Sequence, residues 1–314
     1  MDYIILKEQV QKFRRNMEAE RKSPNTVSTY NVALNGLLEY AAENTEGDFE
    51  FKELVFDYID NLSADLKPSS INIKRSAIRS FVTFLKERGA IDEDFSSYIK
   101  SIRNNKKKKD ILEPKEIKQL LNHLSNELKE ASGYNVYHKA RNLTMVVFML
   151  YTATRRGEVV KVKFSDIDFI NNEIKVLGKG DKERIIPLKA ELKESLYNFR
   201  DIIEKLHIAD YNVKSDYLFR SERVNPATQE KDSPMTPRNV LLIVKKACKK
   251  AGIEKNITAH SLRHIFASYA IQNNMNIRAL SDILGHSSTS ITLDIYSHII
   301  SNEIKQSEMG KLEY

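Results

Sequence analysis

The fold class is decided by residues 173–188, which read EIKVLGKGDKERIIPL. Two short runs in which apolar and polar residues alternate, 173–177 and 183–188, lie on either side of a glycine-rich segment. This pattern predicts a β-hairpin with Lys179 in or beside its turn. Because the other periodic stretches have helical spacing, the sequence predicts a mainly α fold with a small β-sheet, of the α+β class.

The length of 314 residues indicates two domains, since a domain typically has about 100–200 residues. We expect a helical domain over 1–102, a basic linker over 103–112 and a mixed domain over 113–314. Ser, Asn or Pro stands at the start of several predicted helices. These helices cover about residues 6–20, 24–43, 51–62 and 68–88 in the first domain, and 114–129, 136–152, 190–206, 238–252, 261–273, 277–284 and 289–300 in the second.

Composition excludes several classes of protein. The longest apolar run, 143–151, is far shorter than the about 20 residues that a membrane-spanning helix needs. The N-terminal residues show no export signal. Cys248 is the only cysteine, which excludes an internal disulfide and a cysteine-based zinc site. We therefore expect a cytoplasmic protein with no membrane segment.

Charge is distributed unevenly along the chain, whose formal net charge is +7. Acidic residues dominate 39–65, and basic residues dominate 67–88. The apolar residues of the second stretch recur at helical spacing, while Arg75, Arg79 and Lys86 fall on another side of the same helix. This basic stripe is either a solvated helix face or a surface for an anionic partner, with Lys74, Arg75 and Arg79 as the candidate contacts.

The predicted linker contains the run RNNKKKK at 103–109, which has no sequence-local acid to neutralise it. Such a run either clamps the phosphates of a nucleic acid, with a steep salt dependence, or serves as a solubilising tether. The candidate phosphate contacts here are Arg103, Lys106, Lys107, Lys108 and Lys109.

Several reactive residues at the ends of predicted elements together suit phosphoryl transfer. They are Arg155, Lys179, His260, Arg263, His286 and Tyr296. Two forked guanidiniums can bind the negative charge of a pentacoordinate phosphorus bidentately, and a lysine and a histidine can exchange protons with the leaving and attacking oxygens. A phenol in a cationic pocket is an activated nucleophile, because nearby positive charge lowers its pKa from about 10.

Some of these residues allow other interpretations. His260 and His264 are spaced like the two histidines of H-E-x-x-H zinc helices, but Ser261 stands where that motif needs a glutamate. We therefore expect His264 to be a buried, hydrogen-bonded helix residue. Gly178 and Gly180 lack the spacing of an ATP-binding phosphate loop, which excludes an ATPase.

The order of these motifs resembles the tyrosine recombinases, the phage integrase family, and especially its compact Xer-like members. The matching segments are TATRRGEV at 152–159, GKGDKER at 178–184, HSLRH at 260–264, LGHS at 284–287 and IYSH at 295–298. The segment SPNTVSTY at 23–30 resembles the opening of the family's core-binding domain, so the resemblance covers nearly the whole chain. One departure is that the first segment usually reads Thr-Gly-Leu-Arg, whereas Ala153 and Thr154 replace Gly and Leu here.

The resemblance implies a role for each matching basic residue. Arg155 and Arg263 would hold the scissile phosphate of DNA. Lys179 would protonate the leaving 5′ oxygen, His260 would assist proton transfer, and His286 would contact the phosphate and pack around it.

The resemblance also implies that Tyr296 attacks the phosphate to give a 3′-phosphotyrosyl link. Glu158 falls on the family's acidic support position, and its Arg-x-x-Glu spacing favours Arg155 over the neighbouring Arg156. The rival phenols are Tyr151 and Tyr269, which we interpret as core or interface residues.

The implied activity is site-specific DNA recombination by a catalytic domain that needs no cofactor and no metal. The implied partner is double-stranded DNA at the nucleoid. The resemblance also implies a tetramer of this chain on two DNA sites, with the segment 301–314 docked on a neighbouring subunit, and it allows for an accessory protein. The alternatives are a type IB topoisomerase-like enzyme that relaxes DNA, a non-catalytic DNA-binding regulator and a metal-dependent nuclease.

Overall fold

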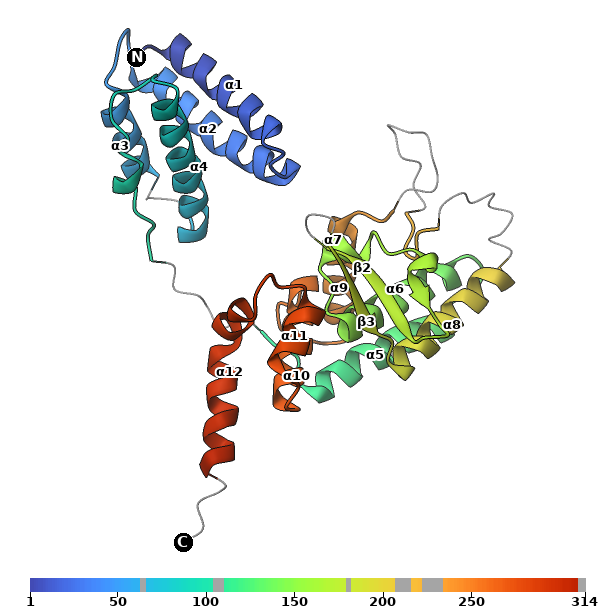
Figure 1. The fold of residues 1–314 in the computed structure, drawn as a ribbon. Helices are drawn as coiled ribbons and strands as arrows, with labels where there is room; N and C mark the ends of the chain where they lie inside the picture. Colours follow the sequence, from blue (N-terminus) through green and yellow to red (C-terminus); the bar gives the residue numbers. More distant parts are fainter. Residues whose placement is uncertain (63–65, 104–109, 179–181, 207–215, 222–233, 310–314) are drawn as a thin grey trace. The chain divides into compact units, whose positions relative to one another are not determined.

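The computed structural model describes residues 1–62, 66–103, 110–178, 182–206, 216–221 and 234–309 (Figure 1). The chain divides into two compact units, Met1–Lys107 and Lys108–Tyr314. Most of the predicted linker, including Lys106, Lys107, Lys108 and Lys109, lies outside the described residues.

The N-terminal unit is helical. It contains α1 (Tyr3–Ala19), α2 (Pro24–Asn44), α3 (Phe51–Asn61), α4 (Pro68–Glu87) and the short 3₁₀ helix η1 (Ser96–Tyr98). The helix starts have the expected chemistry, since the Ser23 hydroxyl accepts a hydrogen bond from the Thr26 N–H at 3.1 Å, and Pro24 and Pro68 each stand in a first turn. The four predicted helices are confirmed to within three residues at each end.

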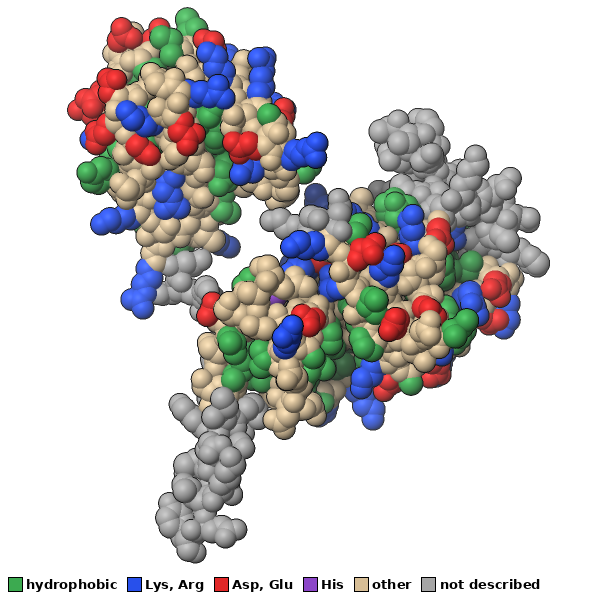
Figure 2. All heavy atoms as spheres, in the orientation of Figure 1, with side chains coloured by type: hydrophobic (Ala, Val, Ile, Leu, Met, Phe, Trp, Pro, Cys, Tyr) green, Lys and Arg blue, Asp and Glu red, His purple; other side chains and the backbone are tan. Residues whose placement is uncertain are grey.

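The apolar stripe of α4 forms the centre of this unit. Phe81 is fully buried, and its ring lies 5.5 Å from that of Phe13 on α1 and 6.0 Å from that of Phe51 on α3. The other residues of the stripe, Ile71, Ile78, Val82 and Leu85, are also buried. The apolar side predicted for this helix is therefore confirmed, and its basic residues lie on the remaining sides. Figure 2 shows acidic side chains gathered on the side of the unit that carries α3.

The C-terminal unit combines helices with one small antiparallel sheet in the order β1-β2-β3. Its hairpin pairs Ile174 with Ile186 and Val176 with Arg184, which confirms the predicted hairpin. The strands are β1 (Ile167–Asp168), β2 (Glu173–Leu177) and β3 (Glu183–Pro187). The helices are α5 (Pro114–Lys129), α6 (Asn135–Thr152), α7 (Arg156–Val159), η2 (Phe164–Asp166), α8 (Ala190–Lys205), α9 (Pro237–Lys250), α10 (Ala259–Gln272), α11 (Ile277–Leu284) and α12 (Thr289–Met309).

Three local features of this unit differ from the prediction. The short elements α7 and β1 were not expected, because four and two residues are too few to show a period. Helix α10 begins two residues earlier, since the Thr258 hydroxyl caps the Ser261 N–H at 3.2 Å, and His260 therefore lies in its first turn. Helix α12 continues to Met309 instead of ending near residue 300.

Helix α6 is the centre of the larger core and packs against α5, α8 and α10. The hairpin covers this core with the buried side chains of Ile174, Val176 and Ile186. A separate small cluster of Ala153, Ala267, Ala270, Ile271, Leu280, Leu284 and Tyr296 joins α10, α11 and α12. This second cluster determines where the candidate site forms. Among the described residues, no helix has the length and apolar character needed to cross a membrane.

Candidate active site

Arg155 lies immediately after helix α6, where the chain turns sharply. Ala153 ends the helix in the left-handed conformation, with φ of 52°, and its N–H donates to the Met149 carbonyl at 3.1 Å. Arg155 then begins α7. Its main-chain N–H donates to Glu158 Oε2 at 2.8 Å, and its Nη1 donates to Glu158 Oε1 at 2.7 Å. One carboxylate therefore fixes both the backbone and the guanidinium of Arg155.

The same carboxylate also binds Arg184, a residue of β3 to which sequence reasoning gave no role. Arg184 Nη2 donates to Glu158 Oε2 at 2.7 Å, and its Nε donates to the Ile283 carbonyl at 2.8 Å. Burial raises the pKa of Glu158, but the hydrogen bonds and charges of Arg184 and Arg155 outweigh it and hold this pKa below the usual value. The sequence did contain a signal for this contact. Arg184 lies two residues before the buried Ile186, so both side chains are on the inner face of the strand.

Arg263 projects from α10 into the same region and is 2% exposed. Its Nη1 donates to the Ala153 carbonyl at 2.9 Å and its Nη2 to the Leu284 carbonyl at 2.5 Å. A guanidinium has five N–H groups, so these two bonds fix its plane and leave it capacity for a ligand. Burial, followed by the charge of Arg155, lowers the pKa of Arg263 to about 10. This group of side chains therefore holds more positive charge than Glu158 alone balances.

His286 follows α11 and borders the same charges. Its Nδ1 lies 2.8 Å from Thr292 Oγ1. Burial and then the charges of Arg263, Arg155 and Arg184 lower the pKa of His286 to about 4, so its ring is neutral near pH 7. The structure thus brings three of the predicted basic residues together and adds Arg184.

Two glycines give Arg184 the space that it occupies. Gly285 ends α11 with φ of 61°, and a Cβ at this position would lie 3.1 Å from Arg184 Nη1. A Cβ on Gly178 would lie 3.4 Å from the same atom, and the Gly178 N–H donates to the Lys182 carbonyl at 2.8 Å. Lys179 lies outside the described residues, but the residue before it lies against Arg184.

Tyr296 is buried on α12, where its hydroxyl lies 2.9 Å from His264 Nδ1. Burial raises the pKa of Tyr296 to about 12, and the nearby charge of Arg263 lowers it by less. The positive charge therefore acts in the expected direction, but the expectation that the pKa of this phenol is lowered overall is wrong. Positive charge lies near the hydroxyl, but removal of the hydroxyl from water has the larger effect.

The two histidines of α10 occupy different environments. His260 is exposed in the first turn, whereas His264 is buried, and their rings meet edge to face with centroids 4.6 Å apart. The prediction that His264 is buried and hydrogen-bonded is confirmed. Within the described residues no group of three or more His, Cys, Asp and Glu side chains is placed to hold a metal ion.

The rival residues lie in other places. Arg156 is exposed and does not share the carboxylate contacts that fix Arg155. Tyr269 donates its hydroxyl hydrogen to the Leu112 carbonyl at 3.0 Å, and Tyr151 packs against the larger core.

The candidate DNA contacts of α4 are half-buried and bind other parts of their own unit. Lys74 Nζ donates to the Tyr58 hydroxyl at 3.0 Å. Arg75 Nη1 donates to the Lys100 carbonyl at 2.5 Å, and Arg79 Nη1 donates to the Ile99 carbonyl at 3.0 Å. These arginines hold the segment that leads toward the predicted linker. Arg103, the next candidate along the chain, is exposed.

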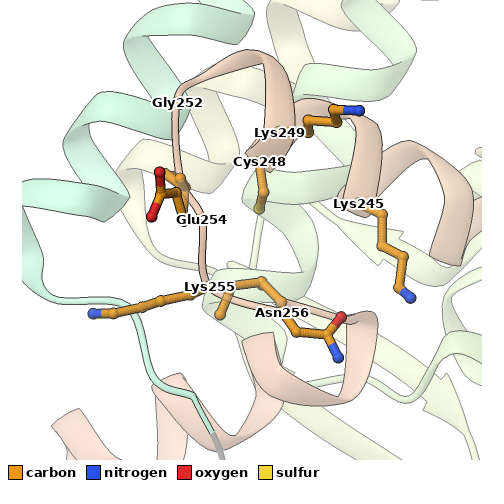
Figure 3. A pocket seen from close by; sticks show the side chains of 9 residues that line it. Lys245, Cys248, Lys249, Gly252, Glu254, Lys255 and Asn256 are labelled. Carbon is orange, nitrogen blue, oxygen red and sulfur yellow. The ribbon is translucent and has the colours of Figure 1, made fainter.

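A pocket at the end of α9 is separate from these groups (Figure 3). Lys245, Cys248 and Lys249 come from the helix, and residues 252–257 complete the wall. Lys255 donates to Glu116 Oε2 at 2.6 Å, and burial raises the pKa of the Cys248 thiol to about 11. These groups have structural roles and are poorly suited to nucleophilic chemistry.

Comparison with known protein families matches both units. The pattern described as the phage integrase family matches residues 110–303, and that described as the phage integrase N-terminal SAM-like domain matches residues 10–89. A tyrosine recombinase of Pseudothermotoga lettingae is 31% identical over 296 residues, which cover 91% of this chain and 92% of that protein. The tyrosine recombinase XerD of Staphylococcus haemolyticus is 29% identical over 288 residues, covering 90% of this chain and 91% of that one.

Solved structures share the fold. The XerH recombinase bound to its difH substrate has a TM-score of 0.67 and 22% identity, covering 92% of this chain and 80% of that one. A lambda integrase dimer bound to a COC′ core site has a TM-score of 0.67 and 15% identity, covering 90% and 96%. The family matches over both units, together with the 31% identity to the Pseudothermotoga lettingae tyrosine recombinase, show that the chain belongs to the phage integrase family of tyrosine recombinases.

Proposed function

We propose that the chain is a site-specific DNA recombinase that cleaves and rejoins DNA through a 3′-phosphotyrosyl intermediate at Tyr296. The observation that carries this proposal is that Tyr296 on α12 packs against α10, the helix that carries Arg263. Arg155 and Arg184, joined through Glu158, add positive charge near Arg263 and His286. A phosphodiester is the anion that this arrangement suits, because it offers two charged oxygens to forked guanidiniums.

Arg155 and Arg263 bind the non-bridging oxygens in this proposal. Arg263 is fixed from behind by two carbonyls, and Arg155 is fixed by Glu158, so both are oriented before DNA arrives. Arg184 shares the carboxylate and acts on the phosphate through the charge that it adds. The buried, neutral ring of His286 then packs beside the phosphate.

Proton transfer completes the reaction. Tyr296 Oη attacks phosphorus as the bond to the 5′ oxygen breaks, and Lys179 supplies the proton that this leaving oxygen needs. His260, exposed at the start of α10, assists at the DNA-facing side. The phosphotyrosyl ester keeps the energy of the phosphodiester, so rejoining needs no nucleotide cofactor.

The proposal also includes further DNA contacts and an assembly of several subunits. Lys74, Arg75, Arg79, Arg103 and the lysines of 106–109 would contact DNA phosphates and grooves. Four subunits on two DNA sites, with 301–314 docked on a neighbour, form the proposed synapse, and DNA as substrate places the protein at the nucleoid. The lambda integrase dimer bound to a core site supports a multimeric DNA complex.

Replacement of the nucleophile tests the proposal. Tyr296→Phe is expected to bind DNA normally and to give no covalent adduct on a nicked suicide substrate, because it lacks the attacking oxygen. The wild-type chain is expected to form the adduct in EDTA and to join strands from two different DNA molecules. An adduct with Tyr296→Phe contradicts the assignment of the nucleophile. Relaxation of DNA without joining between molecules indicates a topoisomerase instead.

A further inference from the structure

Tyr296 has a partner that the proposed function leaves unused. Its hydroxyl and His264 Nδ1 lie 2.9 Å apart, and the two side chains are 3% and 8% exposed. The rings meet at 64° with centroids 5.5 Å apart, so the contact joins the edge of the imidazole to the phenol oxygen. This geometry excludes bulk water from the hydroxyl and gives its proton one immediate neighbour among the described contacts.

The position of His264 is fixed by the helix that also carries Arg263. Its ring lies against that of His260 at 83°, and its carbonyl accepts a hydrogen bond from Ser268 Oγ at 2.8 Å. Because Arg263 and His264 are consecutive on α10, the helix presents a phosphate-binding group and an imidazole to the same phenol. Tyr296 itself is on α12, so packing of α12 on α10 completes the arrangement.

Resting on the proposed role of Tyr296 as nucleophile, we propose that His264 Nδ1 accepts the phenolic proton during cleavage and returns it during rejoining. In cleavage the O–H bond of Tyr296 breaks while its oxygen bonds to phosphorus, and the proton moves to Nδ1 to give an imidazolium. The 5′ oxygen leaves with a proton from Lys179. Rejoining reverses both transfers, so protons and charge balance over one cycle.

Burial explains why an acceptor is needed at this position. Since burial opposes the ionised form of Tyr296, a free phenolate is too rare to be the attacking species near pH 7. Transfer to a neighbour in the transition state avoids that intermediate, and a positioned base typically contributes about 10²–10⁴-fold to the rate. An imidazole is suited to this exchange because its ordinary pKa lies near 6.5.

Single-turnover cleavage of a nicked suicide substrate by the full chain tests the proposal. In His264→Asn the side-chain amide can occupy the position of Nδ1 and keep a hydrogen bond, but it cannot take a proton. We expect unchanged DNA binding, cleavage slower by about 10²-fold near neutral pH, and a rate that continues to rise with pH where the wild-type rate is level. Tyr269→Phe, which removes a hydroxyl of the same helix that binds the Leu112 carbonyl and not the His264 ring, is the matched control and is expected to cleave at the wild-type rate.

A substrate with sulfur as the 5′ leaving atom separates the two proton transfers, because a thiolate leaves without protonation. This substrate is expected to leave the His264→Asn defect in place, since the defect concerns the attacking oxygen. Restoration by sulfur, or wild-type rate and pH profile in His264→Asn, overturns the proposal.

Two further measurements distinguish a failure of the His264 proposal from loss of folding in the variant and from a failure of the proposed function. If His264→Asn unfolds, His264→Gln, a second amide that can hold a hydrogen bond but cannot take a proton, replaces it on both substrates. Cleavage by His264→Gln at the wild-type rate overturns the proposal. An adduct formed by Tyr296→Phe removes the proposed function itself, whereas an inactive Tyr296→Phe beside a fully active His264→Asn removes only the role of His264.

Discussion

Arginines are held in opposite ways in the two units. In the C-terminal unit, Arg155 and Arg184 share the buried carboxylate of Glu158, and Arg263 stands behind them on main-chain carbonyls. In the N-terminal unit, Arg75 and Arg79 bind only the carbonyls and hydroxyl of the segment 99–101 among the contacts described.

The difference separates an anion-binding centre from a basic surface. One carboxylate among three guanidiniums leaves net positive charge where water is scarce, so a phosphate is attracted strongly. Carbonyls orient Arg75 and Arg79 without adding formal charge, and both side chains remain near water, where salt screens them. The first arrangement suits catalysis, and the second suits reversible binding along a DNA backbone.

The largest expected effect is that of Glu158→Gln. The substitution removes the one negative charge and leaves Arg184, whose side chain is 10% exposed, without compensation. Breaking a buried ion pair in this way typically costs about 3–5 kcal/mol. Urea unfolding of the full chain measures the loss, and suicide-substrate cleavage is expected to fall with it. Glu93→Gln, which breaks the exposed pair between Lys52 and Glu93, is the control in the N-terminal unit and is expected to have little effect.

If both substitutions shift unfolding equally, the contrast between a buried centre and an exposed surface is wrong. If Glu158→Gln lowers cleavage but not stability, the carboxylate acts only on the orientation of the arginines.

The next expected effect is a dependence of the free energy of unfolding on pH, which comes from His286 in the C-terminal unit. The pKa of His286 is about 4 in the folded chain against about 6.5 when unfolded, so between these values the unfolded chain binds the additional proton. The free energy of unfolding is therefore expected to fall as pH decreases from about 6.5 toward 4. His286→Gln is expected to flatten this decline in urea unfolding measured between pH 7 and 5. An unchanged slope would mean that neither burial nor the arginines lower the pKa of this ring.

Part of the site was predictable because its signals are local. The hairpin, the helices and the motifs that carry Arg155, Arg263, His286 and Tyr296 can be identified within short windows, and packing brings those windows together. Arg184 was missed because its role depends on the pairing of β3 with β2 and on the position of Glu158, which lies 26 residues earlier.

The sequence also led to the wrong expected direction for the pKa shift of Tyr296, for a related reason. The residue types show that positive charge surrounds the phenol, but they do not show how completely α10, α11 and α12 remove it from water. Burial raises the pKa of Tyr296 and the charge of Arg263 lowers it, and the size of each effect depends on distances set by packing. Lys179 and most of the linker stay predictions.

Arg79→Gln tests the basic surface and is expected to have a moderate effect. If its guanidinium contacts one phosphate, the slope of log affinity against log salt decreases by about 0.9. Filter binding or anisotropy on cognate duplex DNA at several salt concentrations measures this slope. Asn72→Ala is the uncharged control, because Asn72 holds Ile102 with two hydrogen bonds of 2.9 Å. If the slope changes in Asn72→Ala but not in Arg79→Gln, Arg79 does not contact a phosphate and only holds the segment 99–101 in place.

The smallest expected effect is that of Ala153→Gly. Ala153 has φ of 52°, a left-handed conformation that disfavours an L-residue by about 1–2 kcal/mol, so glycine relieves strain. Glycine also removes a fully buried methyl group, worth about 0.8 kcal/mol, and increases the freedom of the unfolded chain by about 0.4–1 kcal/mol. These effects nearly cancel, and cleavage should persist because the Ala153 carbonyl, which glycine keeps, binds Arg263.

Arg21→Gly is the control in the N-terminal unit. Arg21 is exposed and has φ of 54°, so its replacement removes no buried methyl group and is expected to stabilise the chain slightly more in urea unfolding. A larger gain for Ala153→Gly than for Arg21→Gly would show that strain beside Arg263 exceeds that of an ordinary helix end, and that the family's glycine at this position relieves more than the buried methyl contributes.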